Sequence, residues 1–127
     1  MTKLKINPVL VFLLIILVAS ITSCQYDFVE IDLPDESIPV SFSEEILPIF
    51  SKNNCTECHN SNSSLVDLSP DKAYDSIVPD LIDENDPANS KIYLYPNPSY
   101  SDHQYKKYAP IEAALVLNWI TQGAKDN

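Results

Sequence analysis

Prolines limit the secondary structure of this chain, because its 127 residues include ten prolines and a single glycine. Proline lacks a backbone N–H and is tolerated in a helix only in the first turn, so each one marks a helix start, a kink or a break. Short helices separated by long loops are therefore expected. The single glycine, Gly123, also excludes the glycine-rich loops that bind phosphates and dinucleotides.

The first helix is predicted to begin at Ser41. The spacing of Ser41 and Glu44 is that of a capping box, in which each residue satisfies a backbone N–H of the first turn. Pro48 must lie in the first turn or kink the helix, and two asparagines end it at residues 53–54. Its buried face is expected to contain Ile46, Leu47, Ile49 and Phe50.

Prolines indicate three further helices. A serine or aspartate followed by proline opens helices over 70–78 and 87–95, and Pro110 opens the last helix, which Gly123 ends. The expected fold class is all-α, with about four short helices and long loops. The apolar face of the last helix is expected to comprise Ile111, Ala114, Leu115, Val116, Trp119 and Ile120.

Residues 1–23 have the features of an export signal. Lys3 and Lys5 precede an unbroken apolar run over residues 9–19. At a rise of ~1.5 Å per residue this run is too short for a hydrocarbon core of ~30 Å, whereas it matches the apolar part of a secretory signal peptide. The alternative is a short membrane anchor that extends through Ile21.

The four residues at 21–24, Ile-Thr-Ser-Cys, resemble the lipobox of bacterial lipoproteins: an aliphatic residue and two small residues before a cysteine. The resemblance implies that Cys24 is lipidated, becomes the mature N-terminus and holds the protein on a membrane of the cell envelope. Gln25, in place of a retention aspartate, favours the outer membrane, with the protein facing the periplasm or the surface. The alternative is an ordinary cleavage site followed by a free or buried cysteine.

Acidic residues dominate the chain, with 18 aspartates and glutamates against 8 basic residues and a formal charge of −10. Such a surface disfavours nucleic acid as a partner and favours proteins with a basic docking patch. Residues 24–40 are acidic and contain two prolines, so they are predicted to form a tether before a folded domain at 41–127. Partial alternation over 29–33 leaves open a strand packed on that domain.

Cys55, Cys58 and His59 form the sequence C-x-x-C-H, the attachment signature of c-type haem. Cysteines at i and i+3 share one side of a helical turn, so both sulfurs can form thioethers with the two vinyl groups of one haem. The histidine that follows is then placed as the proximal iron ligand. The motif therefore predicts one covalent haem c as the cofactor.

Three other interpretations of the motif are open. C-x-x-C also occurs in redox dithiols, although the βαβ pattern of thioredoxin-like proteins is missing. Cys55, Cys58, His59 and His103 have the ligand types of a zinc site. The two cysteines could also form a structural disulfide in an exported protein.

Segments on both sides of the motif carry a further pattern, which comprises residues 42–50, 55–59, 65–68, 73–74 and 112–124. Together they resemble the small cytochrome c domains of Bacteroidetes-type lipoproteins, and the resemblance covers residues 42–127. It implies a cytochrome c-like bundle around a single haem, with the first and last helices crossing near it.

The sixth iron ligand departs from that family pattern. The family usually supplies a methionine from the loop before the last helix, and the single methionine here is Met1, which signal cleavage removes. His103, the one histidine besides His59, lies in that loop and is the possible distal ligand. Otherwise the sixth position holds water, a tyrosine, a lysine or nothing.

Three functions follow from these alternatives. The leading hypothesis is a membrane-tethered, single-haem electron carrier of the cell envelope that exchanges electrons with redox proteins. The second is a haem enzyme or small-ligand sensor with an open sixth coordination site, and the third is a non-haem accessory lipoprotein with a disulfide at the motif. The tyrosines between residues 93 and 108 could pack against the haem edge or against a partner.

Overall fold

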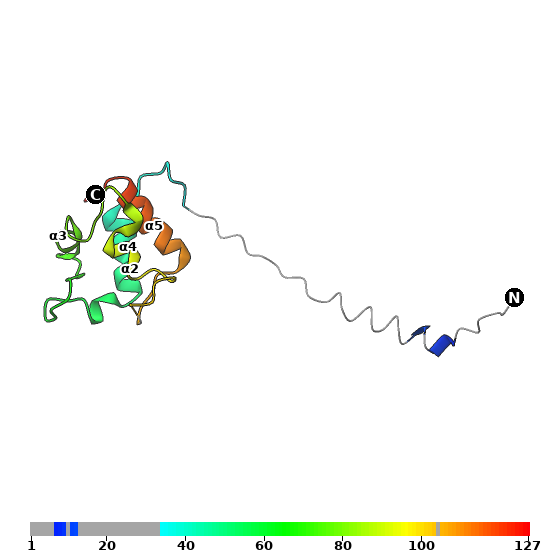
Figure 1. Cartoon of the computed structure of the whole chain (residues 1–127). Coiled ribbons are helices and arrows are strands. Elements are labelled where there is room, and N and C mark those ends of the chain that lie inside the picture. The colour runs from blue at the N-terminus through cyan, green and yellow to red at the C-terminus, as the bar shows by residue number, and fades with distance from the viewer. Residues whose placement is uncertain (1–6, 10, 13–33, 104) are drawn as a thin grey trace. The chain divides into compact units, whose positions relative to one another are not determined.

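The computed structural model describes residues 7–9, 11–12, 34–103 and 105–127 (Figure 1). The chain divides into two compact units, residues 1–30 and 31–127. In the first unit residues 8–9 and 11–12 are helical, while Cys24 and most of the predicted signal peptide lie outside the described residues. Among the helices described, none combines the length and the apolar character needed to cross a bilayer.

The second unit consists of short helices joined by long loops, and its described residues contain no strand, which confirms the all-α class for this part of the chain. The last helix, α5 (Pro110–Thr121), packs against the first turn, η2 (Phe42–Ile46), and against α4 (Lys91–Leu94) (Figure 1). In order, the elements are the π-helical turn η2 (Phe42–Ile46), α2 (Leu47–Lys52), the 3₁₀ turn η3 (Cys55–Glu57), α3 (Ala73–Ile77), the 3₁₀ turn η4 (Pro87–Asn89), α4 (Lys91–Leu94) and α5 (Pro110–Thr121).

The first helix begins at Ser41 as predicted, but its opening turn is wider than an α-turn, because residues 42–46 are π-helical. The Ser41 hydroxyl accepts a hydrogen bond from the Glu44 N–H at 3.2 Å. The carboxylate that accepts from the Ser41 N–H belongs to Glu45, at 2.8 Å. The predicted reciprocal bond from Glu44 is therefore wrong by one residue, since the wider turn brings position 45 back over the cap.

The two middle helices are shorter than predicted, because two serines bond to neighbouring loops. The helix expected over 70–78 begins at Ala73, since the Ser69 hydroxyl donates to the Asp67 carboxylate at 2.6 Å and does not cap the helix. The helix expected over 87–95 is interrupted at Ser90, whose hydroxyl accepts from the Asp83 N–H at 2.9 Å. Such side-chain bonds compete with a continuous helix.

The helix α5 begins at Pro110 as expected, and Gly123 follows its end with a φ of 95° that suits a residue without a Cβ. Its buried face is rotated from the predicted one. Ile111, Ala114 and Leu115 are only partly buried. The residues of α5 that are buried are Glu112, Ala113, Val116, Trp119 and Ile120.

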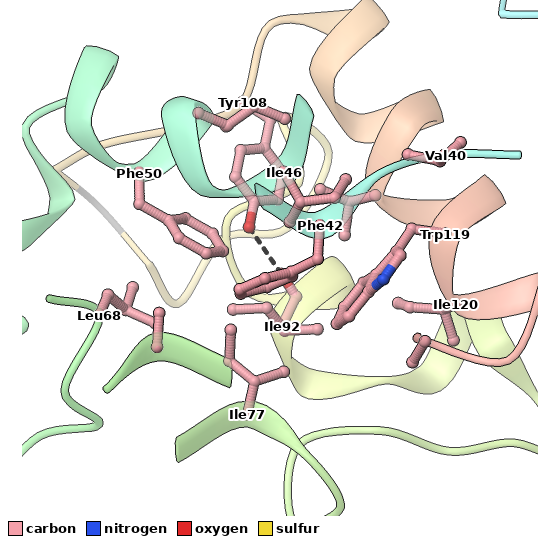
Figure 2. Close-up of a cluster of buried hydrophobic side chains, with 14 of the residues drawn as sticks. Val40, Phe42, Ile46, Phe50, Leu68, Ile77, Ile92, Tyr108, Trp119 and Ile120 are labelled. Carbon is pink, nitrogen blue, oxygen red and sulfur yellow. Dashed lines mark hydrogen bonds between the residues drawn. The ribbon is translucent and has the colours of Figure 1, made fainter. Parts of the chain in front are cut away.

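One apolar core joins these helices (Figure 2). Within it the ring of Phe42 packs on Tyr74 and Trp119, with centroids 5.2 and 5.3 Å apart. The buried Tyr108 hydroxyl donates to the Ile92 carbonyl at 3.0 Å (Figure 2). Burial raises the pKa of Tyr108, so that its phenol remains a neutral donor. The other buried apolar residues are Val40, Ile46, Ile49, Phe50, Leu68, Ala73, Ile77, Ala113, Val116, Ile120 and Ala124.

The last residues of the predicted tether, 24–40, pack on the folded unit. Val40 is buried, and its N–H donates to the side-chain oxygen of Gln122 at 2.8 Å. The Gln122 amide nitrogen donates to the carbonyls of Glu36 and Ile38, at 3.1 and 2.9 Å. The segment 36–40 is therefore fixed beside the C-terminal end of α5.

Candidate functional site

Two asparagines separate the C-x-x-C-H segment from α2, and the second of them has the left-handed conformation. Asn54 has a φ of 54°, which asparagine adopts more readily than most residues, and it turns the chain into η3. The N–H groups of Cys58 and His59 both donate to the Cys55 carbonyl, at 3.2 and 2.9 Å. Because residues i and i+3 of a 3₁₀ turn lie one above the other, the two cysteines share one side of this turn.

Both cysteines of the motif are free thiols, Cys55 half-buried and Cys58 exposed. Burial raises the pKa of the Cys55 thiol, while Lys106 opposes this shift and Glu112 reinforces it. Redox dithiols work through a thiolate whose pKa is lowered. The environment of Cys55 therefore disfavours the dithiol interpretation.

The ring of His59 is oriented by a backbone carbonyl. Its Nδ1 lies 3.1 Å from the carbonyl oxygen of Val66, and an oxygen there requires the proton on Nδ1. That tautomer leaves Nε2 unprotonated, which is the form in which imidazole binds a metal. The His59 carbonyl accepts from the Leu68 N–H at 3.0 Å, so the loop that supplies Val66 is fixed against the motif.

His103 lies beside His59, although the two residues are far apart in the sequence. Their ring centroids are 6.1 Å apart and their planes are inclined by 23°. Two imidazoles on opposite sides of one metal ion, with bonds of ~2 Å each, place their centroids roughly 6 Å apart. The His103 Nδ1 is buried and has no hydrogen-bond partner among the described residues.

These residues fit the group that the motif implies. The donor set consists of two thiols on one turn and two imidazoles at the spacing of a shared metal. A buried, unpaired imidazole nitrogen is unfavourable unless the site is completed by a further partner. The arrangement can therefore receive a haem that is attached through Cys55 and Cys58 and ligated through the histidines.

The loop that carries His103 is attached to the motif by charged side chains. The Lys106 ammonium contacts the carboxylate of Glu57, the residue before Cys58, at 3.2 Å. The Lys107 ammonium donates to the carbonyl of Tyr95 at 3.3 Å and also to the carbonyl of Tyr100. These contacts hold the loop closed and fix it beside the motif.

A buried carboxylate connects the helix before the motif to α5. The Oε2 atom of Glu112 accepts from the side-chain amide of Asn53 at 2.9 Å and from the Ala109 N–H at 2.8 Å. Its Oε1 atom lies 3.6 Å from the exposed ammonium of Lys52. Glu112 thus caps the start of α5 and holds the residue that ends α2, two positions before Cys55.

Other ligands have less support among the described residues. No three His, Cys, Asp or Glu side chains of residues 7–9, 11–12, 34–103 and 105–127 form a group that could hold a metal ion, which is the arrangement the zinc interpretation needs. A hollow of about 670 Å³ is lined by Tyr74, Leu81, Asp83 and other residues, but neither the C-x-x-C-H segment nor His103 contributes to its wall.

The tyrosines near His103 have separate roles. Tyr108 is buried in the core, whereas Tyr105 is 90% exposed. The rings of Tyr95 and Tyr100 stack with centroids 5.2 Å apart.

Sequence analysis did not identify Val66, Glu57, the two loop lysines or Glu112 as parts of this site. Glu112 had a usable signal, because an acidic residue at the third position of a proline-initiated helix is typical of a cap. Lys106 and Lys107 are adjacent cations in an acidic chain and lie close to His103 in the sequence. Val66 contributes its backbone carbonyl, and every residue has one, so the sequence gives no signal for this role.

The chain matches no protein-family model, and no curated protein or solved structure shows significant similarity to it. The features of the site are the turn that bears Cys55 and Cys58, the oriented imidazole of His59 and the neighbouring imidazole of His103.

Proposed function

We propose that this protein is a membrane-tethered c-type cytochrome that carries electrons in the cell envelope through a single covalent haem. The observation that carries the proposal is the pairing of the C-x-x-C-H turn with a second imidazole. Cys55 and Cys58 lie on one turn, and the rings of His59 and His103 are 6.1 Å apart. Two imidazoles that bind one iron from opposite sides have a similar centroid spacing, and this agreement supports the proposal.

A haem supplies a one-electron iron couple when it is bound. Cys55 and Cys58 would hold the haem through two thioethers, each formed by addition of the S–H group across a vinyl double bond, with sulfur on one carbon and hydrogen on the other. This addition needs no oxidant. His59 binds through Nε2, because Val66 keeps its proton on Nδ1. His103 would supply the second imidazole.

Two imidazoles favour the ferric state, so the reduction potential is expected to lie below that of cytochromes with histidine and methionine ligands. An occupied sixth position also leaves no open site for a substrate or a gaseous ligand. The His103 contact therefore favours an electron carrier over a haem enzyme or sensor.

The location of the protein follows from the lipobox. Acyl chains on Cys24 hold the protein on a membrane, with ~0.8 kcal/mol from each buried CH₂ group. The net charge of −10 suits redox partners that present a basic patch. We place the protein on the outer membrane, facing the periplasm or the surface.

The haem assignment is tested by expression together with haem-maturation machinery, followed by extraction with acid–acetone. Colour should stay with the wild-type protein, because the haem is covalent. It should be reduced in Cys55→Ala and in Cys58→Ala and be absent from the double variant. Retention of all the haem in the double variant would overturn the proposal.

The anchor is tested separately by Cys24→Ser. This variant should leave the membrane fraction while its haem spectrum is unchanged, since Cys24 and the motif have independent roles. If the variant stays on the membrane, the apolar segment at 9–19 is an uncleaved anchor and the lipobox assignment is wrong.

A further inference from the structure

The described residues of the loop between α4 and α5, 95–103 and 105–109, contain no helix, and they carry His103 between two groups of tyrosines. A backbone bond joins the two ends of the loop, from the Tyr108 N–H to the Pro96 carbonyl at 3.0 Å. A bond at the ends does not by itself fix the middle of the loop, where His103 lies. The position of His103 therefore depends on side-chain contacts.

Lys107 supplies the first of these contacts. Its ammonium donates to the carbonyls of Tyr95 and Tyr100, so that it connects the end of the loop to the beginning. Lys107 is only partly exposed, and hydrogen bonds from a charged donor are stronger than those between neutral groups. Its removal leaves two carbonyls without a charged donor and frees the loop segment that leads to His103.

The ion pair of Glu57 and Lys106 supplies the second contact. Glu57 lies between the two cysteines, and its carboxylate is 3.2 Å from the Lys106 ammonium. The Glu57 side chain is 64% exposed and that of Lys106 is 38% exposed, so solvent and salt weaken the pair. The pair therefore sets the position of the loop relative to the motif, while Lys107 makes the larger contribution to its shape.

We propose that Lys107 and the Glu57–Lys106 pair are positioning residues that hold His103 at the distal face of the haem. This inference rests on the proposed function. The three residues do not touch the iron. They determine how often the His103 imidazole is in place and hence how easily an external ligand competes with it.

The experiment compares haem-loaded Lys107→Met with a matched control, Lys91→Met. Both substitutions remove an ammonium and keep a long side chain, but the Lys91 side chain makes no hydrogen bond within the described residues. The high-spin fraction of the ferric protein and the rate of CO binding to the ferrous protein are measured for each, together with Tm. Lys107→Met should speed CO binding by roughly tenfold, while Lys91→Met should match the wild type.

A charge exchange tests the ion pair. Glu57→Gln should raise the rate of CO binding by about twofold, as expected for an exposed pair. Glu57→Lys should raise it further, because two ammonium groups then repel each other. The double variant Glu57→Lys/Lys106→Glu should restore the wild-type rate. These variants lie at exposed positions, so they test the inference even if Lys107→Met does not fold.

The outcomes separate this inference from the proposed function. If the wild-type protein takes up no covalent haem, both are overturned. If it is haem-loaded but five-coordinate, the covalent haem stands, whereas the positioning inference fails and the open-site enzyme or sensor replaces the electron carrier. If the wild type is six-coordinate and Lys107→Met and Glu57→Lys both bind CO at its rate, only the positioning inference fails. Faster CO binding with an unchanged Tm supports positioning and not a general loss of stability.

Discussion

The two sides of the candidate site are held by different kinds of contact. On the side of His59, the chain is fixed by bonds to or from backbone groups that are close in sequence, including those of Cys55 to His59 and of His59 to Val66 and Leu68. On the side of His103, a loop without helix is held mainly by two lysines. The contacts on the His59 side are expected to be insensitive to salt, whereas those on the His103 side include a charge pair that salt weakens.

The motif side also has a local support that the distal side lacks. The side-chain amide of Asn60 donates to the carbonyls of Thr56 and Glu57, at 2.9 and 3.1 Å. These carbonyls belong to the turn that carries the cysteines, so one side chain closes the end of that turn. His59 is held by backbone bonds and His103 by side chains. If both bind the haem iron as proposed, His103 is therefore expected to exchange first.

The largest effect is expected for His103→Ala. Without the distal imidazole the iron should become high-spin, and CO binding should be faster by roughly tenfold or more, because no internal ligand competes. Absorption spectra in both oxidation states and flash photolysis measure this. The wild-type ferric protein should also lack the weak band near ~695 nm that methionine ligation produces.

If the spectrum of His103→Ala is identical to that of the wild type, His103 does not bind the iron. The loop would then carry an uncoordinated histidine, and the open-site enzyme or sensor would become the better hypothesis if the wild type is also five-coordinate.

The next effect in size is expected for Glu112→Ala, which tests how the motif side is connected to α5. The substitution removes the acceptor of the Asn53 amide and of the Ala109 N–H, and it should lower the free energy of unfolding by about 2–3 kcal/mol. Chemical denaturation of the haem-loaded protein measures the change. Glu44→Ala is the control, because Glu44 is exposed and its carboxylate has no hydrogen-bond partner in the described residues. Equal losses in the two variants would contradict a specific role for Glu112.

A smaller effect is expected for Asn60→Ala. Loss of the two bonds to the motif turn should lower the free energy of unfolding by ~1 kcal/mol and reduce the fraction of chains that acquire haem. The pyridine haemochrome spectrum gives that fraction per protein. Asn62→Ala is the matched control, since Asn62 is exposed and uses only its backbone N–H, toward the Asn60 side chain. Full haem loading of Asn60→Ala would show that backbone bonds alone hold the motif side.

The smallest effect is expected for Ser69→Ala, beside the loop that supplies Val66. Hydrogen bonds from the Ser69 hydroxyl and N–H lower the pKa of Asp67 below its ordinary value of 3.8. A lowered carboxyl pKa contributes stability above the ordinary value, and this contribution is lost as the pH falls through the folded value. Ser69→Ala should therefore raise the pKa of Asp67 and make unfolding slightly less dependent on pH below about 4. NMR titration of the Asp67 carboxyl measures it, with Ser64→Ala as the control; an unchanged pKa would contradict the assigned cause.

The parts of the molecule that the sequence predicts are those whose residues are consecutive or evenly spaced. The C-x-x-C-H turn, the helix start at Ser41 and the last helix from Pro110 to its end near Gly123 all depend on neighbours within a few positions. The predicted helix boundaries and caps are wrong where a contact outside the helix competes with the local sequence signal. Ser90 accepts a hydrogen bond from the Asp83 N–H and interrupts a predicted helix. The wide first turn places the carboxylate of Glu45, and not that of Glu44, on the Ser41 N–H.

The candidate site divides in the same way. His59 is identified by its place next to Cys58, whereas His103 is a candidate only because it is the other histidine and lies in the loop before α5. Its contact with the His59 ring depends on the path of a loop between two prolines and α5. The bonds of Glu112 to Asn53 and of Lys106 to Glu57 join residues that no spacing rule connects.

The three bonds made by the Gln122 side chain would have a mechanical consequence if the chain is anchored at Cys24, as we propose. A pull applied to the chain before residue 36 acts first on the bonds between Gln122 and the backbone of Glu36, Ile38 and Val40. The force passes from there into the C-terminal end of α5, and it reaches neither the motif turn nor the His103 loop directly. If Cys24 is lipidated as proposed, the candidate haem site is thereby shielded from tension on the anchor.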